Sequence, residues 1–121
     1  MAEDIKNRVR DFYRTLESGD LQDLDRWVAP DFADHALPPG FPSGLEGFRR
    51  YFASLRGAFA DFSLEVEDCI AEGDRVVARV SGVGTFVREF MGVQPNGQRV
   101  CVPFVDIWRL ENGKLVEHWG V

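Results

Sequence analysis

Cysteine and histidine are scarce in this sequence, which contains two of each among 121 residues. Cys69 and Cys101 lie far apart, and together with the histidines they form none of the short-spaced ligand patterns that bind zinc. The polar beginning, MAEDIKNR, lacks the apolar segment of a secretory signal. We therefore expect a cytoplasmic protein without a bound metal, in which the cysteines are buried free thiols and not a disulfide.

Positive charge and long apolar runs are also scarce. The sequence has 14 basic against 20 acidic residues, a net charge of −6, and its longest basic run is the pair Arg49–Arg50. A surface that binds nucleic acid needs clustered lysine and arginine, so we expect no nucleic-acid partner. No apolar run approaches the ~18 residues of a membrane-spanning helix, so we expect no membrane partner either.

Aromatic residues are abundant, with ten phenylalanines and three tryptophans, and the first part of the chain arranges its apolar residues with helical spacing. Residues Ala2–Ser18 repeat apolar side chains every three or four positions, which predicts an amphipathic helix that ends at Gly19. Asp20 is placed to cap a short second helix, which continues to about Val28 and is ended by Pro30.

A loop with four of the six prolines follows, and a third helix is predicted from Ser43 or Gly44 onward. Its apolar stripe has spacings of three and four and consists of Leu45, Phe48, Phe52, Leu55 and Phe59.

The period of the apolar pattern then changes to two, which is typical of strands. Strands are predicted over Ser63–Glu72, Arg75–Phe86, Arg99–Glu111 and Lys114–Val121. Tight turns are expected between the first two and, at the Asn-Gly pair, between the last two. The chain therefore reads as one domain, 1–121, of the α+β class. Three N-terminal helices pack against a curved antiparallel sheet, an arrangement that can enclose a cone-shaped pocket.

Asp106 interrupts the apolar alternation of the third predicted strand. Residues two apart on a strand share a face, so its carboxylate points the same way as Phe104 and Trp108. A carboxylate on an apolar face loses hydration, which favours its neutral form and suits a group that exchanges protons near neutral pH. The alternative is a structural role, with Asp106 at a strand distortion or paired with an arginine such as Arg79.

Five segments together resemble the SnoaL-like polyketide cyclases, a branch of the superfamily that includes nuclear transport factor two and ketosteroid isomerase. These segments are DFADHA, GLEGFRRYFASLRGAFADFSLEVED, AEGDRVVARVSGVGTF, FMGVQPNGQRV and VDIWRLENGKLVEHW. The resemblance implies a cone-shaped sheet with three covering helices, a homodimer, and closure of a polyketide ring by an aldol reaction without a cofactor. It also implies that an aspartate on a late strand acts as acid and base, and Asp106 occupies the matching position.

The face on which His118 lies depends on the turn at Asn112–Gly113. A two-residue turn places Asp106 opposite Trp119 and turns His118 to the other side of the sheet. A three-residue turn with a bulge places His118 opposite Asp106 and creates an Asp–His pair. The sequence is compatible with both.

His35 is a further candidate for a catalytic residue, and Arg79 is a candidate for a substrate-binding residue. In the family the position of His35 tends to reach the cavity, and the alternative is a surface histidine in a polar turn. Arg79 shares a strand phase with Val77 and Ser81, so it either faces inward to bind a substrate oxygen or Asp106, or is exposed. The aromatic and sulfur-containing candidates for pocket walls, each equally compatible with an ordinary core, are Trp27, Phe52, Phe86, Phe90, Met91, Trp108 and Trp119.

Two functional hypotheses follow. The first is a cofactor-independent, polyketide cyclase-like enzyme that uses Asp106 as general acid and base in the aldol cyclisation or isomerisation of a small hydrophobic carbonyl compound. The second is a non-catalytic, dimeric module of the same fold that binds a small molecule, which is favoured by Phe86 at a position where many relatives have histidine. An enzyme should hold Asp106 in a closed cavity, with a raised pKa and with another polar group within hydrogen-bonding reach. A binding module should have a shallow cone or an Asp106 neutralised by a salt bridge.

Overall fold

The computed structural model describes residues 2–120 and begins with the amphipathic helix that the sequence predicts. Helix α1 (Ala2–Ser18) buries Val9, Phe12 and Leu16 completely, because side chains three and four positions apart lie on one face of a helix. The helix ends before Gly19, whose N–H donates to the carbonyl of Thr15 at 2.8 Å.

The second predicted helix is a short 3₁₀ helix, η1 (Leu21–Arg26), and it ends before the predicted boundary. Asp20 caps it as expected, with its carboxylate accepting from the backbone N–H of Gln22 at 2.9 Å. The prediction of a loop from Pro30 onward is wrong for its first five residues, which belong to strand β1 (Val28–Asp34), and is confirmed for residues 35–43. Pro30 is tolerated there because β1 lies at the edge of the sheet, where a missing N–H breaks no ladder.

Helix α2 (Gly44–Ala58) corresponds to the third predicted helix. It ends one residue earlier than its apolar stripe suggested, because Phe59 already begins strand β2 (Phe59–Glu72). The remaining strands are β3 (Arg75–Phe86), β4 (Arg99–Glu111) and β5 (Lys114–Gly120). The predicted end of the last strand, Val121, lies outside the described residues.

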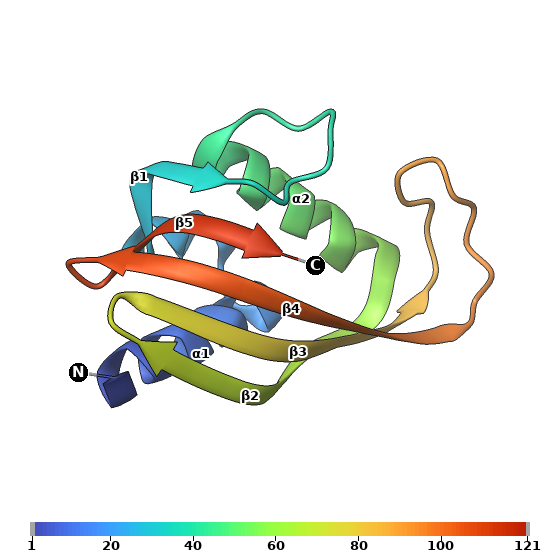
Figure 1. Cartoon of the computed structure of the whole chain (residues 1–121). Coiled ribbons are helices and arrows are strands. Elements are labelled where there is room, and N and C mark those ends of the chain that lie inside the picture. Colours follow the sequence, from blue (N-terminus) through green and yellow to red (C-terminus); the bar gives the residue numbers. More distant parts are fainter. Residues whose placement is uncertain (1, 121) are drawn as a thin grey trace.

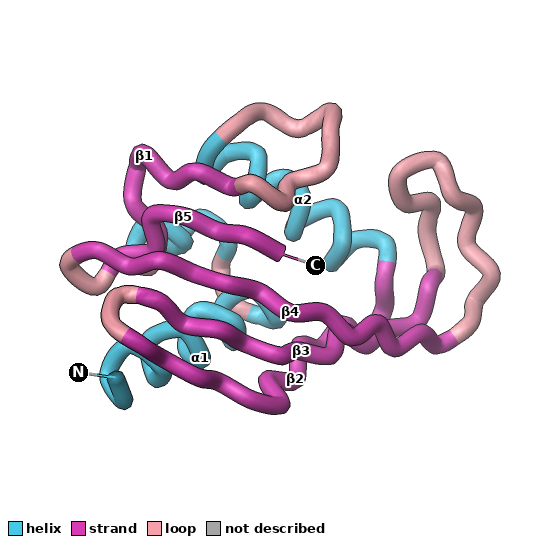
Figure 2. Tube along the Cα trace, in the orientation of Figure 1, coloured by secondary structure: helices cyan, strands magenta, loops and turns pink. Residues whose placement is uncertain are grey.

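The five strands form one curved sheet in the order β1-β5-β4-β3-β2 (Figure 1). Strands β2 to β5 are an antiparallel meander, as predicted, but β1 pairs in parallel with β5. The sheet is therefore mixed and not purely antiparallel. The connection between β3 and β4, residues 87–98, is a loop that rises beside the C-terminal end of α2 (Figure 2).

The hairpin between β4 and β5 has a register that differs from both predicted alternatives. Its turn is the two-residue type, with positive φ angles of 51° at Asn112 and 77° at Gly113. Farther along β5, Leu115 pairs with Leu110 but Glu117 pairs with Arg109, so Val116 is an unpaired bulge residue. His118 consequently lies opposite Trp108, on the same face of the sheet as Asp106.

The core lies between α1, α2 and the inner face of the sheet, with Trp108 at its centre. The Trp108 ring packs edge-on against Phe12, at a centroid distance of 5.1 Å, and against Phe48, at 6.2 Å. Buried β3 residues, Val76, Ala78 and Val80, continue this inner face. No helix within residues 2–120 is long and apolar enough to cross a membrane.

Both cysteines are free thiols, but they are less buried than predicted. Cys69 is half-buried, and Cys101 is exposed because the first residues of β4 extend beyond the part of the sheet that the core covers.

Candidate active site

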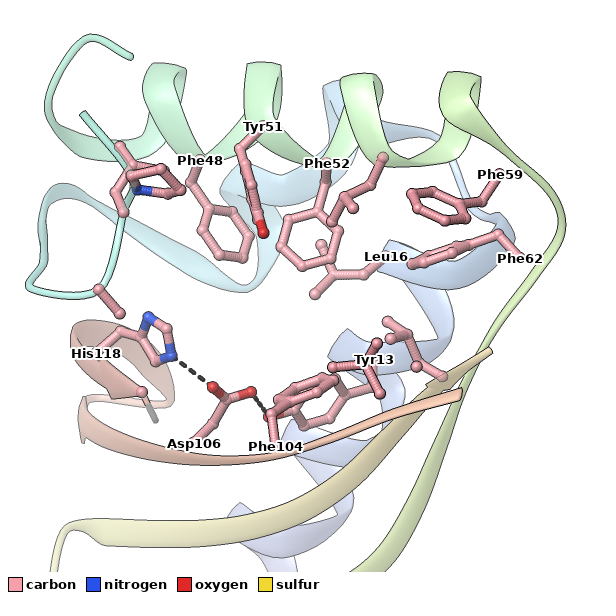
Figure 3. Close-up of a pocket in the computed structure, with 18 of the residues that line it drawn as sticks. Tyr13, Leu16, Phe48, Tyr51, Phe52, Phe59, Phe62, Phe104, Asp106 and His118 are labelled. Atoms are coloured by element: carbon pink, nitrogen blue, oxygen red, sulfur yellow. Dashed lines mark hydrogen bonds and ion pairs between the residues drawn. The ribbon is translucent and has the colours of Figure 1, made fainter. Parts of the chain in front are cut away.

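The inner face of the sheet, α1 and α2 line an open-mouthed cavity of about 460 Å³. Most of its wall is apolar, and six phenylalanines contribute to it: Phe48, Phe52, Phe59, Phe62, Phe90 and Phe104. The polar groups gather toward one end, where Asp106 and His118 lie on the sheet side and Tyr51 on the helix side (Figure 3). A ligand that fills this cavity must therefore be largely apolar, with its polar atoms at one end.

Asp106 lies on the inner face of β4, as the alternation of its strand predicts, and only 7% of its surface is exposed. Its Oδ1 is 2.8 Å from Nε2 of His118, and its Oδ2 accepts a hydrogen bond of 2.6 Å from the hydroxyl of Tyr13. Both carboxylate oxygens are thus held in fixed positions and largely shielded from solvent. Each oxygen keeps a second lone pair for a ligand.

The hydrogen bond from Tyr13 has a defined direction. The indole N–H of Trp108 can only donate, and it donates to the hydroxyl oxygen of Tyr13 at 2.8 Å. The single proton of that hydroxyl is therefore directed to Asp106. Burial, and next the nearby charge of Asp106, raise the pKa of Tyr13 well above its ordinary value, so the hydroxyl remains a donor at neutral and moderately alkaline pH.

His118 lies between two carboxylates. Its Nδ1 is 2.8 Å from Oδ1 of Asp34, and its Nε2 contacts Asp106. An imidazolium can donate from both ring nitrogens at once, one proton to each carboxylate. Burial opposes this charge, but the hydrogen bonds and negative charges of Asp106 and Asp34 outweigh it and raise the pKa of His118 to about 9. The Trp108 ring stacks on the imidazolium at a centroid distance of 4.1 Å, an arrangement that further favours a cation.

The unpredicted strand β1 and the bulge in β5 bring this cluster together. Asp34, at the end of β1, pairs with His118 of β5, and its side chain is 3% exposed. Its Oδ1 also accepts from the backbone N–H of Ala36 at 2.9 Å. Gly120 pairs with Asp106, and a Cβ at that position would lie 3.1 Å from the Asp106 Oδ1 and 3.2 Å from the His118 Nε2. The absence of a side chain there leaves room for the contact.

His35 and Arg79 do not face the cavity. His35 follows the inward-facing Asp34 and points to the opposite side, where its Nε2 is 2.7 Å from Oε2 of Glu117. Arg79 alternates with the buried Ala78 and Val80 and therefore lies on the outer face, where its Nε donates to Oδ2 of Asp68 at 2.7 Å. The Asp106–Arg79 pair that the sequence left open does not form.

Of the predicted wall residues, Phe52, Phe90 and Trp108 line the cavity. Phe86 is buried behind the wall and stacks on Phe59 at 5.0 Å. Trp119 lies on the outer face, because the bulge pairs it with Ile107, and it stacks on His35.

The last two predicted wall residues also lie away from the cavity. Trp27 ends η1 and lies under the guanidinium of Arg8, which is 4.8 Å from its ring centroid. Met91 is exposed in the loop between β3 and β4.

Sequence reasoning missed three polar cavity residues: Tyr13, Tyr51 and Asp34. Tyr13 was visible only as part of the apolar stripe of the first helix. Tyr51 precedes Phe52 in the third predicted helix, and the sequence pattern does not show whether its side chain lines a cavity or packs in the core. Asp34 was overlooked because its neighbour His35 is the more usual chemical group. Residues 2–120 contain no group of three or more histidine, cysteine, aspartate or glutamate side chains arranged to hold a metal ion.

Comparisons with known proteins agree with this fold. The SnoaL-like polyketide cyclase family matches residues 7–121. TsrD from Streptomyces laurentii has a similar structure, with a TM-score of 0.88, 28% identity, and coverage of 98% of this chain and 87% of TsrD. No curated protein matches the sequence significantly.

Two further solved structures are 31% identical to this chain. IdmH from Streptomyces antibioticus, proposed to be a polyketide cyclase, has a TM-score of 0.84 and coverage of 97% of this chain and 90% of IdmH. AclR from Streptomyces galilaeus, proposed to be a hydroxylase, has a TM-score of 0.86 and coverage of 100% of this chain and 76% of AclR. The family match spans nearly the whole chain, and the protein therefore belongs to the SnoaL-like polyketide cyclase family.

Proposed function

We propose that this protein is a cofactor-independent, cyclase-type enzyme in which Asp106 removes the proton α to a carbonyl group of a small hydrophobic ligand. The observation that carries the proposal is the position of Asp106, a buried carboxylate at the polar end of an otherwise apolar cavity. A base in a dry, preorganised site works without solvent reorganisation, and the apolar walls suit a flat carbon skeleton.

Asp106 can both accept and return the proton that this reaction transfers. Asp106 takes the α proton, and the electron pair of the broken C–H bond moves onto the carbonyl oxygen to form an enolate. The enolate carbon attacks a second carbonyl of the same ligand, which forms a carbon–carbon bond and an alkoxide. Asp106 returns its proton to that alkoxide, so cyclisation needs no co-reactant. Return of the proton to a different carbon of the enolate would instead shift a double bond.

His118 and Tyr13 are positioning residues in this scheme. They hold the two oxygens of Asp106 at 2.8 and 2.6 Å and so fix the direction of its free lone pairs. When Asp106 is protonated, the imidazolium keeps its contact with Asp34. The positive charge of His118 is shared between two carboxylates, so the cluster retains one negative charge when Asp106 is ionised.

The family resemblance also implies a homodimer, and we include it in the proposal. The outer face of the sheet carries an exposed apolar residue, Ile70, opposite the half-buried Val77 of β3. A molar mass in solution equal to that of one chain would contradict this part of the proposal.

The test uses a ketone that is small and aromatic enough for the cavity, 2-acetylnaphthalene. Incubation in D₂O with the protein should exchange the methyl protons for deuterium faster than buffer does, as followed by NMR. Asp106→Asn should lower the exchange rate at least ~100-fold, the usual contribution of a general base. Asp68→Asn is the matched control, because Asp68 lies on the outer face and should leave the rate unchanged. Full activity of Asp106→Asn would contradict the assignment.

A second candidate is a binding module without turnover. It is favoured by the contact between Asp106 and His118, which is the kind of salt bridge expected of a binding module. AclR, proposed to be a hydroxylase, is as similar to this chain in identity as IdmH, so similarity does not select the reaction. This candidate predicts that 2-acetylnaphthalene binds to the wild-type protein but shows no exchange above buffer.

A further inference from the structure

Tyr51 reaches into the cavity from the side opposite Asp106. It belongs to α2, and its hydroxyl points from the helix toward the sheet (Figure 3). Its ring is held by three aromatic neighbours, Phe41 and Phe52 in edge-to-face contact at 5.6 and 5.4 Å and Phe90 at 6.1 Å. These contacts fix the ring without using the hydroxyl.

The hydroxyl of Tyr51 has no hydrogen-bond partner within residues 2–120, in contrast to that of Tyr13. Tyr51 is half-buried and its hydroxyl lies at the cavity surface. A polar group at such a site is satisfied by water or by a ligand, and in an apolar cavity a ligand oxygen that replaces water gains specificity from it.

The other side-chain hydrogen-bond donors of the cavity wall already donate to protein acceptors. Among residues 2–120, the wall contains four such donors: Tyr13, Tyr51, Trp108 and His118. Tyr13 donates its only proton to Asp106, and Trp108 donates its only proton to Tyr13. His118 directs both of its N–H groups to carboxylates. Tyr51 is therefore the side chain with a proton left for a ligand.

We propose that Tyr51 is a catalytic residue that donates a hydrogen bond to the carbonyl oxygen of the ligand, on the side of the cavity opposite the base. The enolate part of this role rests on the proposed function. When Asp106 removes the α proton, negative charge develops on the carbonyl oxygen, and a donor fixed at that point stabilises it. The ligand is thus a ketone that lies between α2 and β4, with its oxygen toward Tyr51 and its α carbon toward Asp106.

The environment keeps Tyr51 in its donating form. Burial, followed by the negative charges of Asp106 and Asp34, raises the pKa of Tyr51 above its ordinary value. The phenol consequently remains protonated at neutral pH and donates to the ligand oxygen instead of giving up its proton.

The test compares two probes of nearly equal shape, 2-acetylnaphthalene and 2-isopropenylnaphthalene, which differ by C=O against C=CH₂. The ketone accepts a hydrogen bond through its oxygen, whereas the alkene has no hydrogen-bond acceptor. The ratio of their affinities therefore reports whether the cavity contains a hydrogen-bond donor. In Tyr51→Phe we expect the preference for the ketone to fall about 3- to 10-fold, the range of one neutral hydrogen bond, with the affinity for the alkene unchanged. The variant keeps the ring and its aromatic contacts.

A spectroscopic readout separates donation from packing. A hydrogen bond lowers the stretching frequency of a ¹³C-labelled carbonyl, so the bound ketone should absorb at lower frequency in the wild-type protein than in Tyr51→Phe. An unchanged ketone preference or an unchanged frequency in Tyr51→Phe would overturn the proposal. These equilibrium measurements do not need turnover, whereas the exchange rate of Asp106→Asn tests the proposed function, so the two can fail independently.

Discussion

Two histidine–carboxylate contacts lie back to back at the edge formed by β1 and β5. On the inner face, His118 contacts Asp34 at 2.8 Å, and on the outer face His35 contacts Glu117 at 2.7 Å. The four residues are two pairs of sequence neighbours, Asp34 with His35 and Glu117 with His118. Because successive strand residues point to opposite faces, each pair contributes one member to either side.

The two contacts have nearly the same geometry but differ in exposure. The side chain of His118 is 10% exposed, whereas that of His35 is 47% exposed. Outside, hydrogen bonds from His35 and Arg109 lower the pKa of Glu117, and water screens the charges. Inside, the imidazolium lies between two buried carboxyl groups, Asp34 and Asp106, where little water screens the contacts. Burial, and not the type of residue, makes the inner contact part of the candidate site.

The largest effect that would sharpen this comparison is expected from His118→Leu. The substitution leaves Asp34 and Asp106 buried without their shared cation, and breaking a buried pair in this way costs about 3–5 kcal/mol of folding free energy. Urea unfolding at pH 7 measures the loss. His35→Leu is the matched control and should change the unfolding free energy much less, because Glu117 is partly exposed and keeps its ion pair with Arg109. Equal losses for the two variants would mean that burial does not distinguish the contacts.

The second prediction concerns pH. The pKa of His118 is raised from 6.5 to about 9, so the folded state holds the proton more tightly than the unfolded state. Its stabilising contribution is complete below pH 6.5 and is lost as the pH rises through 9. Over this interval the unfolding free energy should fall by about 3 kcal/mol, because each tenfold difference in proton affinity corresponds to about 1.4 kcal/mol.

Denaturant unfolding at a series of pH values measures this slope. His35→Gln should retain it, because the outer histidine does not cause it, and His118→Gln should largely remove it. A wild-type protein whose stability is constant between pH 6.5 and 9 would show that His118 is not held as a cation.

The sequence alone predicted the parts of the site that depend on one strand or one helix. Period-two alternation placed Asp106 on the inner face of β4, because a strand fixes side-chain direction without reference to its neighbours. The stripe of α1 included Tyr13 for a similar reason, although its bond to Asp106 depends on how the helix packs on the sheet.

The parts that depend on pairing between strands were not predictable. Strand β1 contains Pro30 and is held by its parallel pairing with β5. No local sequence pattern predicts this pairing. The bulge at Val116 determines the face on which His118 lies. The sequence shows only two consecutive apolar residues there, Leu115 and Val116, which the structure buries. Without β1 and the bulge, the Asp34–His118–Asp106 cluster cannot be assembled from the sequence.

The smallest effect is expected from Arg79→Gln, on the outer face of the same sheet. Arg79 and Asp68 form an ion pair of 2.7 Å, but their side chains are 57% and 58% exposed. Solvent screening limits such a pair to less than about 1 kcal/mol, and the loss should shrink further at about 0.5 M salt because the Debye length shortens. Urea unfolding in low and high salt measures both effects, and the exchange rate of 2-acetylnaphthalene should not change. If Arg79→Gln cost as much as His118→Leu, exposure would not be the property that separates the two faces. If it slowed proton exchange instead, the outer face would be coupled to Asp106 through the sheet, and the site could not be described by its cavity residues alone.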